Sequence, residues 1–309
     1  RYSMFKTGAL ISPPDVRDYS IIPTAVKDEG YTSPYNPIIG KQKESNCTAY
    51  SSAYALEAVT GMRLCKGGHY GDREPEHWQG EGRYLREVCD TLHKRGTAKH
   101  GDYTAEYEVQ KAQDHIKANL ASYRAKAAPF KIGPYARART VSEIQAALRA
   151  RHAVIFSGAC ESFNSDKNGT FRMRTPTYGF HAMAIIDWKA GDNRFRCAQS
   201  WGTGFGQKGF CFVPFEDVLR LDDIWVITPF GGIAPDPIIR RTLRKDMKGD
   251  DVKLLQDKLI SLGLDLGKWG ADGDFGSATD AATRSFQKRN SLTVDGIVGP
   301  KSWAVLDAE

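Results

Sequence analysis

Apolar and polar residues follow two different patterns along this chain, helical in its first half and strand-like further on. From Cys47 to Thr60 a run rich in alanine, serine and tyrosine is typical of a helix, and Gly61 directly after it is typical of a helix C-terminus. Segments 83–94 and 141–150 also look helical, and the second is preceded by Ser or Thr residues that favour helix starts. We therefore predict three helices before residue 151.

After Arg151 the pattern changes to short apolar runs bounded by turn residues. "AVIFSGA", "HAMAIID", "RFRCAQSW" and "GFCFVPF" have the length and composition of strands. Helices followed by strands predict an α+β fold, in which a helical half packs against a sheet-rich half. A cleft between two such halves is a usual place for a functional site.

The stretch Thr228–Ile239 contains two glycines and three prolines in "TPFGGIAPDPII". Proline cannot continue a helix or a sheet ladder, so this stretch is typical of a linker. We predict a first domain at residues 1–230, a linker at 231–241 and a small second domain at 242–309.

The second domain has the periodicity of three helices. Two five-residue turns, "DGDFG" at 272–276 and "DGIVG" at 295–299, repeat one another between these helices. Their acidity lacks the ligand spacing of a calcium loop, so we predict no metal and no cofactor. The predicted apolar faces consist of Val252, Leu255, Leu259 and Leu262 before a capping Gly263, then Ala278, Ala282 and Phe286, and finally Trp303 and Leu306 after Pro300.

Composition adds little to this picture, but charge adds one feature. Hydrophobic content of 41% and charged content of 26% are ordinary, and no apolar run approaches the ~20 residues of a membrane-spanning helix. Nine basic and two acidic residues lie between Lys111 and Arg151 in a chain of net charge +6. This stretch could contact an anionic surface or could simply form solvated helix faces, and no nucleic-acid recognition motif accompanies it. We expect a monomer.

The candidate chemistry starts at Cys47. A helix N-terminus favours the thiolate form of cysteine, and Ser45 or Asn46 is expected to cap that helix. A nucleophilic cysteine needs a base, and His181 opens the apolar run "HAMAII", where a sheet would hold it away from water. The plain alternative is a small buried cysteine and a core histidine bonded to the backbone.

A third group follows in "CAQSWGTGFGQKGFCF". The amide of Gln199 can orient a ring nitrogen of the histidine, and Trp201 can shield that contact from water. Together, "CTAYS", "GFHAM" and "QSWGTGFGQKGF" make residues 13–230 resemble the papain-like (C1-type) cysteine peptidases.

This resemblance implies catalytic roles for Cys47, His181, Gln199 and Gln42, with Ser200, Trp201 and Gly202 supporting the substrate cleft. The family usually has asparagine where Gln199 stands. It also has an oxyanion glutamine six residues before the cysteine, whereas Gln42 is five residues before Cys47. The implied chemistry is a thiolate–imidazolium pair that attacks a peptide carbonyl.

The second domain resembles the peptidoglycan-binding-like three-helix domains through "GDDVKLLQDKLISLG", "DGDFG", "ATRSFQKRN" and "VDGIVGPKSWAVL". We expect Asp272, Phe275, Asp295 and Trp303 to take part in wall binding. The two resemblances together imply a bacteriolytic murein endopeptidase that cuts peptide stems or cross-bridges, with peptidoglycan as its partner.

Because no signal peptide is visible, we expect a phage endolysin made in the host cytoplasm that acts on the wall after release. A bacterial autolysin exported by other means is the nearest variant of this idea. The remaining alternatives are a cysteine amidase or transferase acting on another acyl bond, and a catalytically inactive wall-binding or tail protein.

Overall fold

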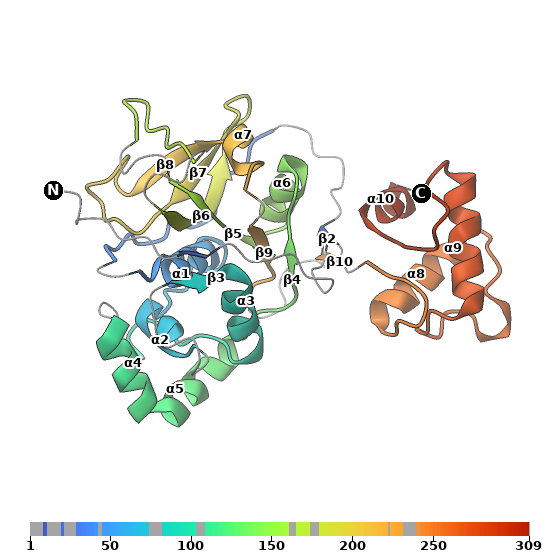
Figure 1. The fold of residues 1–309 in the computed structure, drawn as a ribbon, viewed down its shortest axis with the longest axis horizontal. Coiled ribbons are helices and arrows are strands. Elements are labelled where there is room, and N and C mark those ends of the chain that lie inside the picture. Colours follow the sequence, from blue (N-terminus) through green and yellow to red (C-terminus); the bar gives the residue numbers. More distant parts are fainter. Residues whose placement is uncertain are drawn as a thin grey trace. The chain divides into compact units, whose positions relative to one another are not determined.

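The chain divides into two units, which Figure 1 draws from blue to red along the sequence. The larger unit comprises residues 1–14 and 27–235, and the smaller one comprises residues 15–26 and 236–309. None of the helices in the described residues is both long enough and apolar enough to cross a membrane. The computed structural model describes residues 9–10, 20–21, 29–42, 45–73, 82–102, 109–160, 165–173, 179–221, 223–230, 239–240 and 242–308.

An antiparallel sheet forms one half of the larger unit. Its strands run in the order β4-β9-β5-β6-β7-β8, and every neighbouring pair is antiparallel. The four predicted strands correspond to β5, β6, β7 and β8, whereas β4 and β9 were not predicted. The bounds are β4 (Tyr135–Arg137), β5 (Ala153–Ala159), β6 (Phe180–Trp188), β7 (Arg194–Ala198), β8 (Phe210–Pro214) and β9 (Ile224–Ile227).

Helices form the other half, and in Figure 1 α1 to α5 lie below most of the strands, whereas α6 and α7 lie beside the strands in the upper part of the view. Helix α1 packs against β5 and β6 on one side and against α2 and α3 on the other. The strand β1 (Ala9–Leu10) pairs in parallel with β3 (Arg83–Tyr84) and also contacts β5 and β6. The helices are α1 (Cys47–Thr60), α2 (Lys66–Gly71), α3 (Leu85–Lys94), α4 (Val109–Ala118), α5 (Leu120–Ala127), a short η2 (Ala128–Phe130), α6 (Val141–Arg149) and α7 (Phe215–Val218).

The helix α1 is central because it is buried on all sides. All residues from Cys47 to Val59 are buried, which is the pattern of a core helix rather than of an amphipathic surface helix. It ends as predicted, since Gly61 adopts the left-handed conformation with φ 72° and donates its N–H to the Glu57 carbonyl. The buried Glu57 carboxylate accepts a hydrogen bond from Lys66 Nζ at 2.8 Å, which ties α1 to α2.

Several cations of the basic stretch 111–151 are engaged within the unit. Arg124 pairs with Asp72 at 2.9 Å, and Arg149 pairs with Glu29 at 3.6 Å. Arg137 is buried, with its guanidinium 4.9 Å from the centre of the Trp225 ring. These three side chains have partners within the unit, so the stretch is not a uniform basic face.

The smaller unit contains the three predicted helices around a core of their apolar faces. Ala278 departs from the prediction because it is exposed, and Leu262 is only half-buried. Gly263 has φ 74° and ends the first helix as predicted. The elements are β2 (Ser20–Ile21), antiparallel to β10 (Ile239–Arg240), then α8 (Asp250–Ser261), η3 (Gly267–Trp269), α9 (Ser277–Arg289) and α10 (Pro300–Ala308).

A buried glutamine organises the first of the two repeated turns. Gln256 of α8 donates from Nε2 to Asp272 Oδ1 at 2.9 Å, to the Asp274 carbonyl at 2.9 Å and to Thr279 Oγ1 at 3.0 Å. Its Oε1 accepts the Gly273 N–H at 2.7 Å. The Gln256 side chain therefore supplies hydrogen bonds to backbone groups of a turn that has no regular secondary structure to pair them.

The second turn is held in the same way one helix later. Gln287 of α9 donates to Asp295 Oδ1 at 2.8 Å, to the Ile297 carbonyl at 2.9 Å and to Ser302 Oγ at 3.4 Å. Its Oε1 accepts the Gly296 N–H at 2.9 Å. The repeat in the sequence is thus a repeat in structure, with each turn clamped by a glutamine and leading into the next helix.

We predict that Gln256→Ala destabilises the smaller unit by about 2–4 kcal/mol, because it leaves several buried polar groups without partners. Calorimetry of the full chain measures the melting transition of this unit. Asp257→Ala, at the neighbouring exposed position on α8, is the matched control and should leave that transition unchanged. Equal transitions for the two variants would contradict the structural role of the glutamine.

Candidate active site

Cys47 is the first residue of α1 and is fully buried. It belongs to the same apolar cluster as Ala182 of β6 and Ala9 of β1. Asn46 occupies the N-cap position, as expected, but its side chain makes no capping hydrogen bond, and its Oδ1 is buried without a hydrogen-bond partner. Asn46 therefore takes the N-cap position without the expected side-chain cap, and the thiol lies in the first turn, where backbone N–H groups and the helix dipole favour negative charge.

His181 is the second residue of β6 and pairs with Gly158 of β5. Both strands pack against α1, whose first residue is Cys47. The next residue along β6, Ala182, shares the apolar cluster of Cys47. The fold therefore places the two candidate residues on elements that pack directly against one another, although they are far apart in the sequence.

The imidazole of His181 is shielded by Trp201. The two rings stack with centroids 4.4 Å apart and planes at 25°, and Phe205 packs edge-on against the indole. Burial lowers the pKa of His181 to about 3, while the nearby amide of Gln199 acts in the opposite direction. The Gln199 amide is near the imidazole, but neither ring nitrogen of His181 makes a hydrogen bond of good geometry. The buried imidazole of His181 is therefore neutral at physiological pH.

Gln42 is held by the segment that follows β7. Its backbone N–H donates to the Ser200 carbonyl at 2.7 Å, and the Ser200 hydroxyl donates to Gln42 Oε1. Just before it, Lys41 forms an antiparallel bridge with Trp201. With Oε1 occupied, the Nε2 donor is the group of Gln42 that a reacting oxyanion could use.

The segment before Cys47 is also tied to α1. Gly40 donates its N–H to Tyr54 Oη at 2.7 Å. Residues 40–42 therefore connect the buried helix to the end of β7 and bring Gln42 to the part of the unit that holds Gln199.

The glycines after Trp201 allow this approach. Gly209 has φ 89°, and a Cβ there would collide with the side chain of Ile39. Gly202 has φ 87°, and a Cβ there would press against Lys41. Glycine is thus needed where the turn packs on the segment that leads to Gln42.

A pocket of about 370 Å3 opens beside the indole of Trp201. Because Trp201 also stacks on His181, this pocket adjoins the candidate site, and it offers room for part of a polymeric substrate. Its lining residues are Ile39, Lys41, Trp201, Gly202, Thr203, Gly204 and Phe205.

The four predicted wall-binding residues divide into two groups. Phe275 and Trp303 are fully buried in the core of the smaller unit, so their expected contact with a ligand is wrong: they hold the helices together. Asp272 and Asp295 each line a surface pocket. The sequence analysis missed Trp269, an exposed indole beside Asp272, because a single aromatic residue in a short turn has no periodicity.

Within the described part of the chain, no group of three or more His, Cys, Asp and Glu residues is arranged to hold a metal ion. The six cysteines are all buried and unbridged.

Comparison with solved structures identifies the fold of the larger unit. Xylellain, a cysteine protease from Xylella fastidiosa, superposes with a TM-score of 0.57 at 21% identity and covers 72% of this chain and 95% of its own. The cysteine protease and lectin-like domains of Cwp84 from Clostridium difficile give a TM-score of 0.57 at 15% identity, covering 75% of this chain and 57% of that one. The larger unit therefore has the papain-like cysteine protease fold, as predicted.

Sequence comparison identifies the smaller unit. Residues 248–306 match the family PG_binding_1, whose description reads "Putative peptidoglycan binding domain". A type VI secretion system spike protein of Vibrio cholerae, VgrG3, is 48% identical in an alignment of 75 positions that covers 21% of this chain and 7% of that protein. A probable N-acetylmuramoyl-L-alanine amidase of Bacillus licheniformis is 44% identical over 66 residues, which are 21% of this chain and 19% of that enzyme. The chain thus spans less than a fifth of the length of these relatives.

Buried, neutral His181 makes stability depend on pH. An unfolded histidine titrates near ~6.5, whereas burial lowers the pKa of His181 to about 3, so only the unfolded chain takes up this proton between the two values. The free energy of unfolding should be fully retained above pH ~6.5 and should fall below it by about 1.4 kcal/mol per pH unit for this residue.

Denaturant unfolding from pH 7 to pH 4 measures this dependence. His181→Gln should reduce the slope by one proton, and so should His152→Gln, because burial lowers the pKa of His152 to about 4. An unchanged slope in His181→Gln would show that the ring is already charged in the folded protein.

Proposed function

We propose that this chain is a bacterial cell-wall hydrolase, a cysteine endopeptidase that cuts the peptide stems or cross-bridges of peptidoglycan. The observation that carries the proposal is a papain-like unit with Cys47 at the start of its central helix, joined in one chain to a segment of the peptidoglycan-binding family. The second unit keeps the first close to its substrate, which raises the local concentration of scissile bonds.

In the proposed reaction, neutral His181 first accepts the proton of the Cys47 thiol, and the thiolate sulfur of the resulting pair then attacks the peptide carbonyl carbon. The resulting thiolate and imidazolium charges stabilise each other in a site that excludes water. The tetrahedral intermediate then collapses, and His181 gives the proton to the leaving amine. Water hydrolyses the remaining thioester and regenerates the thiol, with Gln199 orienting the ring.

The oxyanion of that intermediate would lie between two donors. One is the Cys47 N–H, which is in the first turn of α1, where no preceding helical carbonyl is available. The other is Nε2 of Gln42, directed by the bond between its Oε1 and the Ser200 hydroxyl. This geometry supports Gln42 as the oxyanion donor in spite of its shortened distance from Cys47 along the sequence.

Similarity to N-acetylmuramoyl-L-alanine amidases does not favour amidase activity over the proposed endopeptidase activity. The similarity to the Bacillus licheniformis amidase extends over 66 residues, far fewer than the larger unit contains. We assign the reaction from the larger unit and the wall affinity from the smaller one.

Phage origin and place of action belong to the same proposal. We propose an endolysin made in the host cytoplasm that reaches the wall after release. Its six buried and unbridged cysteines support synthesis in a reducing compartment.

The decisive test is digestion of purified peptidoglycan followed by mass spectrometry of the soluble products. The wild-type chain should release stem-peptide fragments with newly exposed amines, and Cys47→Ala should fold normally and release none. Cys89→Ala, which removes another buried thiol on α3, should keep its activity.

Two results would contradict this assignment. Activity of Cys47→Ala within tenfold of wild type would exclude the nucleophile, and products cleaved between sugar and stem peptide would indicate an amidase. No products at all, with no labelling of Cys47 by a thiol-directed peptidase inhibitor, would indicate an inactive wall-binding protein.

A second prediction concerns the positioning of Gln42. Gln42→Ala should lower kcat by about 10²- to 10³-fold, the usual loss for one oxyanion donor. Ser200→Ala should lower kcat by about tenfold with little change in KM, since it loosens the donor without removing it. Steady-state kinetics on a soluble stem peptide measures both, and Ser200→Thr should restore most of the rate. A change in KM alone would show that Ser200 binds substrate and does not position Gln42.

A further inference from the structure

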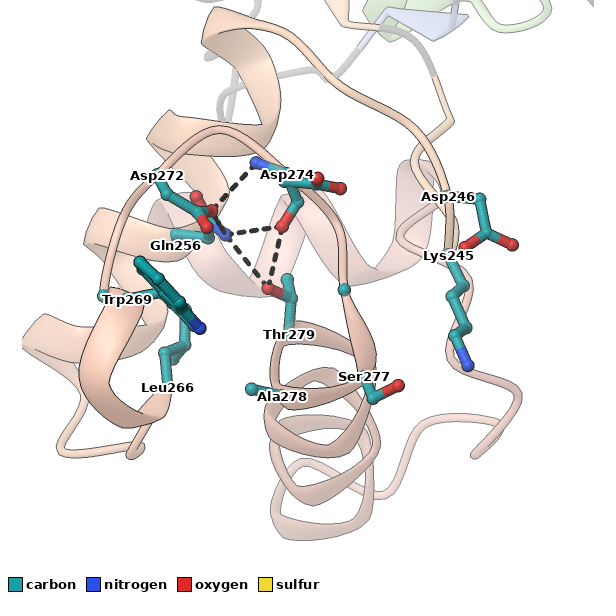
Figure 2. Close-up of a pocket in the computed structure, with 12 residues that line it drawn as sticks. Lys245, Asp246, Gln256, Leu266, Trp269, Asp272, Asp274, Ser277, Ala278 and Thr279 are labelled. Carbon is teal, nitrogen blue, oxygen red and sulfur yellow. Dashed lines mark hydrogen bonds between the residues drawn. The ribbon is translucent and has the colours of Figure 1, made fainter.

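The first glutamine-clamped turn borders a surface cavity of about 690 Å3, shown in Figure 2. On one side of it lie Trp269 and Leu266, and on the other lie Ser277 and Ala278 at the start of α9. Lys245 lies along a further edge. The cavity belongs wholly to the smaller unit and is separate from the candidate active site.

Trp269 is the unusual residue of this cavity. Its side chain is 71% exposed, whereas Phe275 and Trp303 are fully buried in the adjoining core. The indole is therefore not needed to hold the helices together. A large exposed aromatic surface beside a cavity is typical of a binding site, because covering it with a ligand removes apolar area from water.

The rim of the cavity is polar and partly charged. Asp272 accepts hydrogen bonds from the Asp274 N–H and from the Gln256 amide, and these bonds lower the pKa of its carboxyl group, so it remains an acceptor at neutral pH. Ser277 and Lys245 are exposed and offer a hydroxyl and an ammonium group. A flat apolar ring surrounded by hydrogen-bonding groups is complementary to a sugar, which has an apolar C–H face and a polar edge.

The second clamped turn provides an internal comparison. It borders a smaller cavity of about 330 Å3, lined by Gln287, Leu292, Asp295, Lys301 and neighbouring residues. Among the described residues that line it, none is aromatic. The two cavities thus share the clamp and the acidic residue but differ in the stacking surface.

From this difference we infer that the cavity at the first turn binds a sugar ring of the glycan strand, with the ring stacked on Trp269 and its hydroxyl or acetamido groups bonded to Asp272 and Ser277. This inference rests on the proposed wall-binding function and names the part of peptidoglycan that the smaller unit recognises. The larger unit would then act on the peptides while the smaller unit holds the sugars.

The test uses the full chain carrying Cys47→Ala, so that the wall stays intact during the measurement. Sedimentation with insoluble purified peptidoglycan gives the apparent Kd. Adding Trp269→Ala should weaken binding by about tenfold, as expected for removal of a central aromatic contact. Ile260→Ala removes an apolar side chain of α8 that is 44% exposed and does not line the cavity, and it should bind as the parent does.

Competition separates the two components of the wall. A soluble tetramer of N-acetylglucosamine should displace the parent from peptidoglycan, and a free stem peptide should not. Trp269→Phe should retain most of the affinity, and the melting temperatures of all variants should match that of the parent. Unchanged binding by Trp269→Ala, or displacement by the stem peptide alone, would overturn the inference.

A further measurement keeps this inference distinct from the proposed function. With Cys47 restored, Trp269→Ala should hydrolyse a soluble stem peptide at the wild-type rate. If the parent itself fails to bind peptidoglycan, the wall-binding function is wrong as a whole. If the parent binds and Trp269→Ala binds equally well, only the sugar site is wrong.

Discussion

The packing of α1 against β5 and β6 is the constraint on which the larger unit depends. The helix is buried from Cys47 to Val59, so it cannot rotate or slide without disrupting the core on every side. That rigidity fixes the sulfur relative to the strand that carries His181. The same packing removes water from both groups, and this burial lowers the pKa of His181 to about 3, so the imidazole is uncharged. The position of His181 and its protonation state thus have one physical origin.

The segment before Cys47 joins this core to the other candidate residues. The Gly40–Tyr54 hydrogen bond anchors the segment to α1, and the two contacts between Gln42 and Ser200 anchor it to the end of β7. A loop held at both ends loses little entropy when it binds a transition state, because most of its freedom was already lost on folding. The structure therefore gives this displaced glutamine a fixed position next to the segment that follows β7, which supports the proposed role of Gln42 as an oxyanion donor.

The sequence was sufficient where one physical signal dominated. The approximate extent of α1 was predicted because glycine adopts the left-handed conformation at a helix end at low cost, as Gly61 does. Strands β5 to β8 were predicted because buried strands are continuous apolar runs. The short β9 and the glycine-rich α2 carry no such signal. Contacts between distant segments are not contained in any local pattern. They determine why Asn46 makes no side-chain cap, which groups bind Gln42 and how deeply Phe275 is buried. Trp269 was not predicted either, because its exposed ring is informative only beside a cavity, and that cavity is formed by folding.

The duplicated clamp has a consequence for how the smaller unit can change over time. Each turn is held by its own glutamine, so a substitution on the surface of one turn leaves the other intact. The surface residues of one turn can therefore change while the other turn keeps its conformation. Adding an aromatic side chain beside the second turn would give the unit two sugar-binding sites. Binding to a repetitive polymer would then be bivalent, so a ligand released from one site could rebind before it leaves the other.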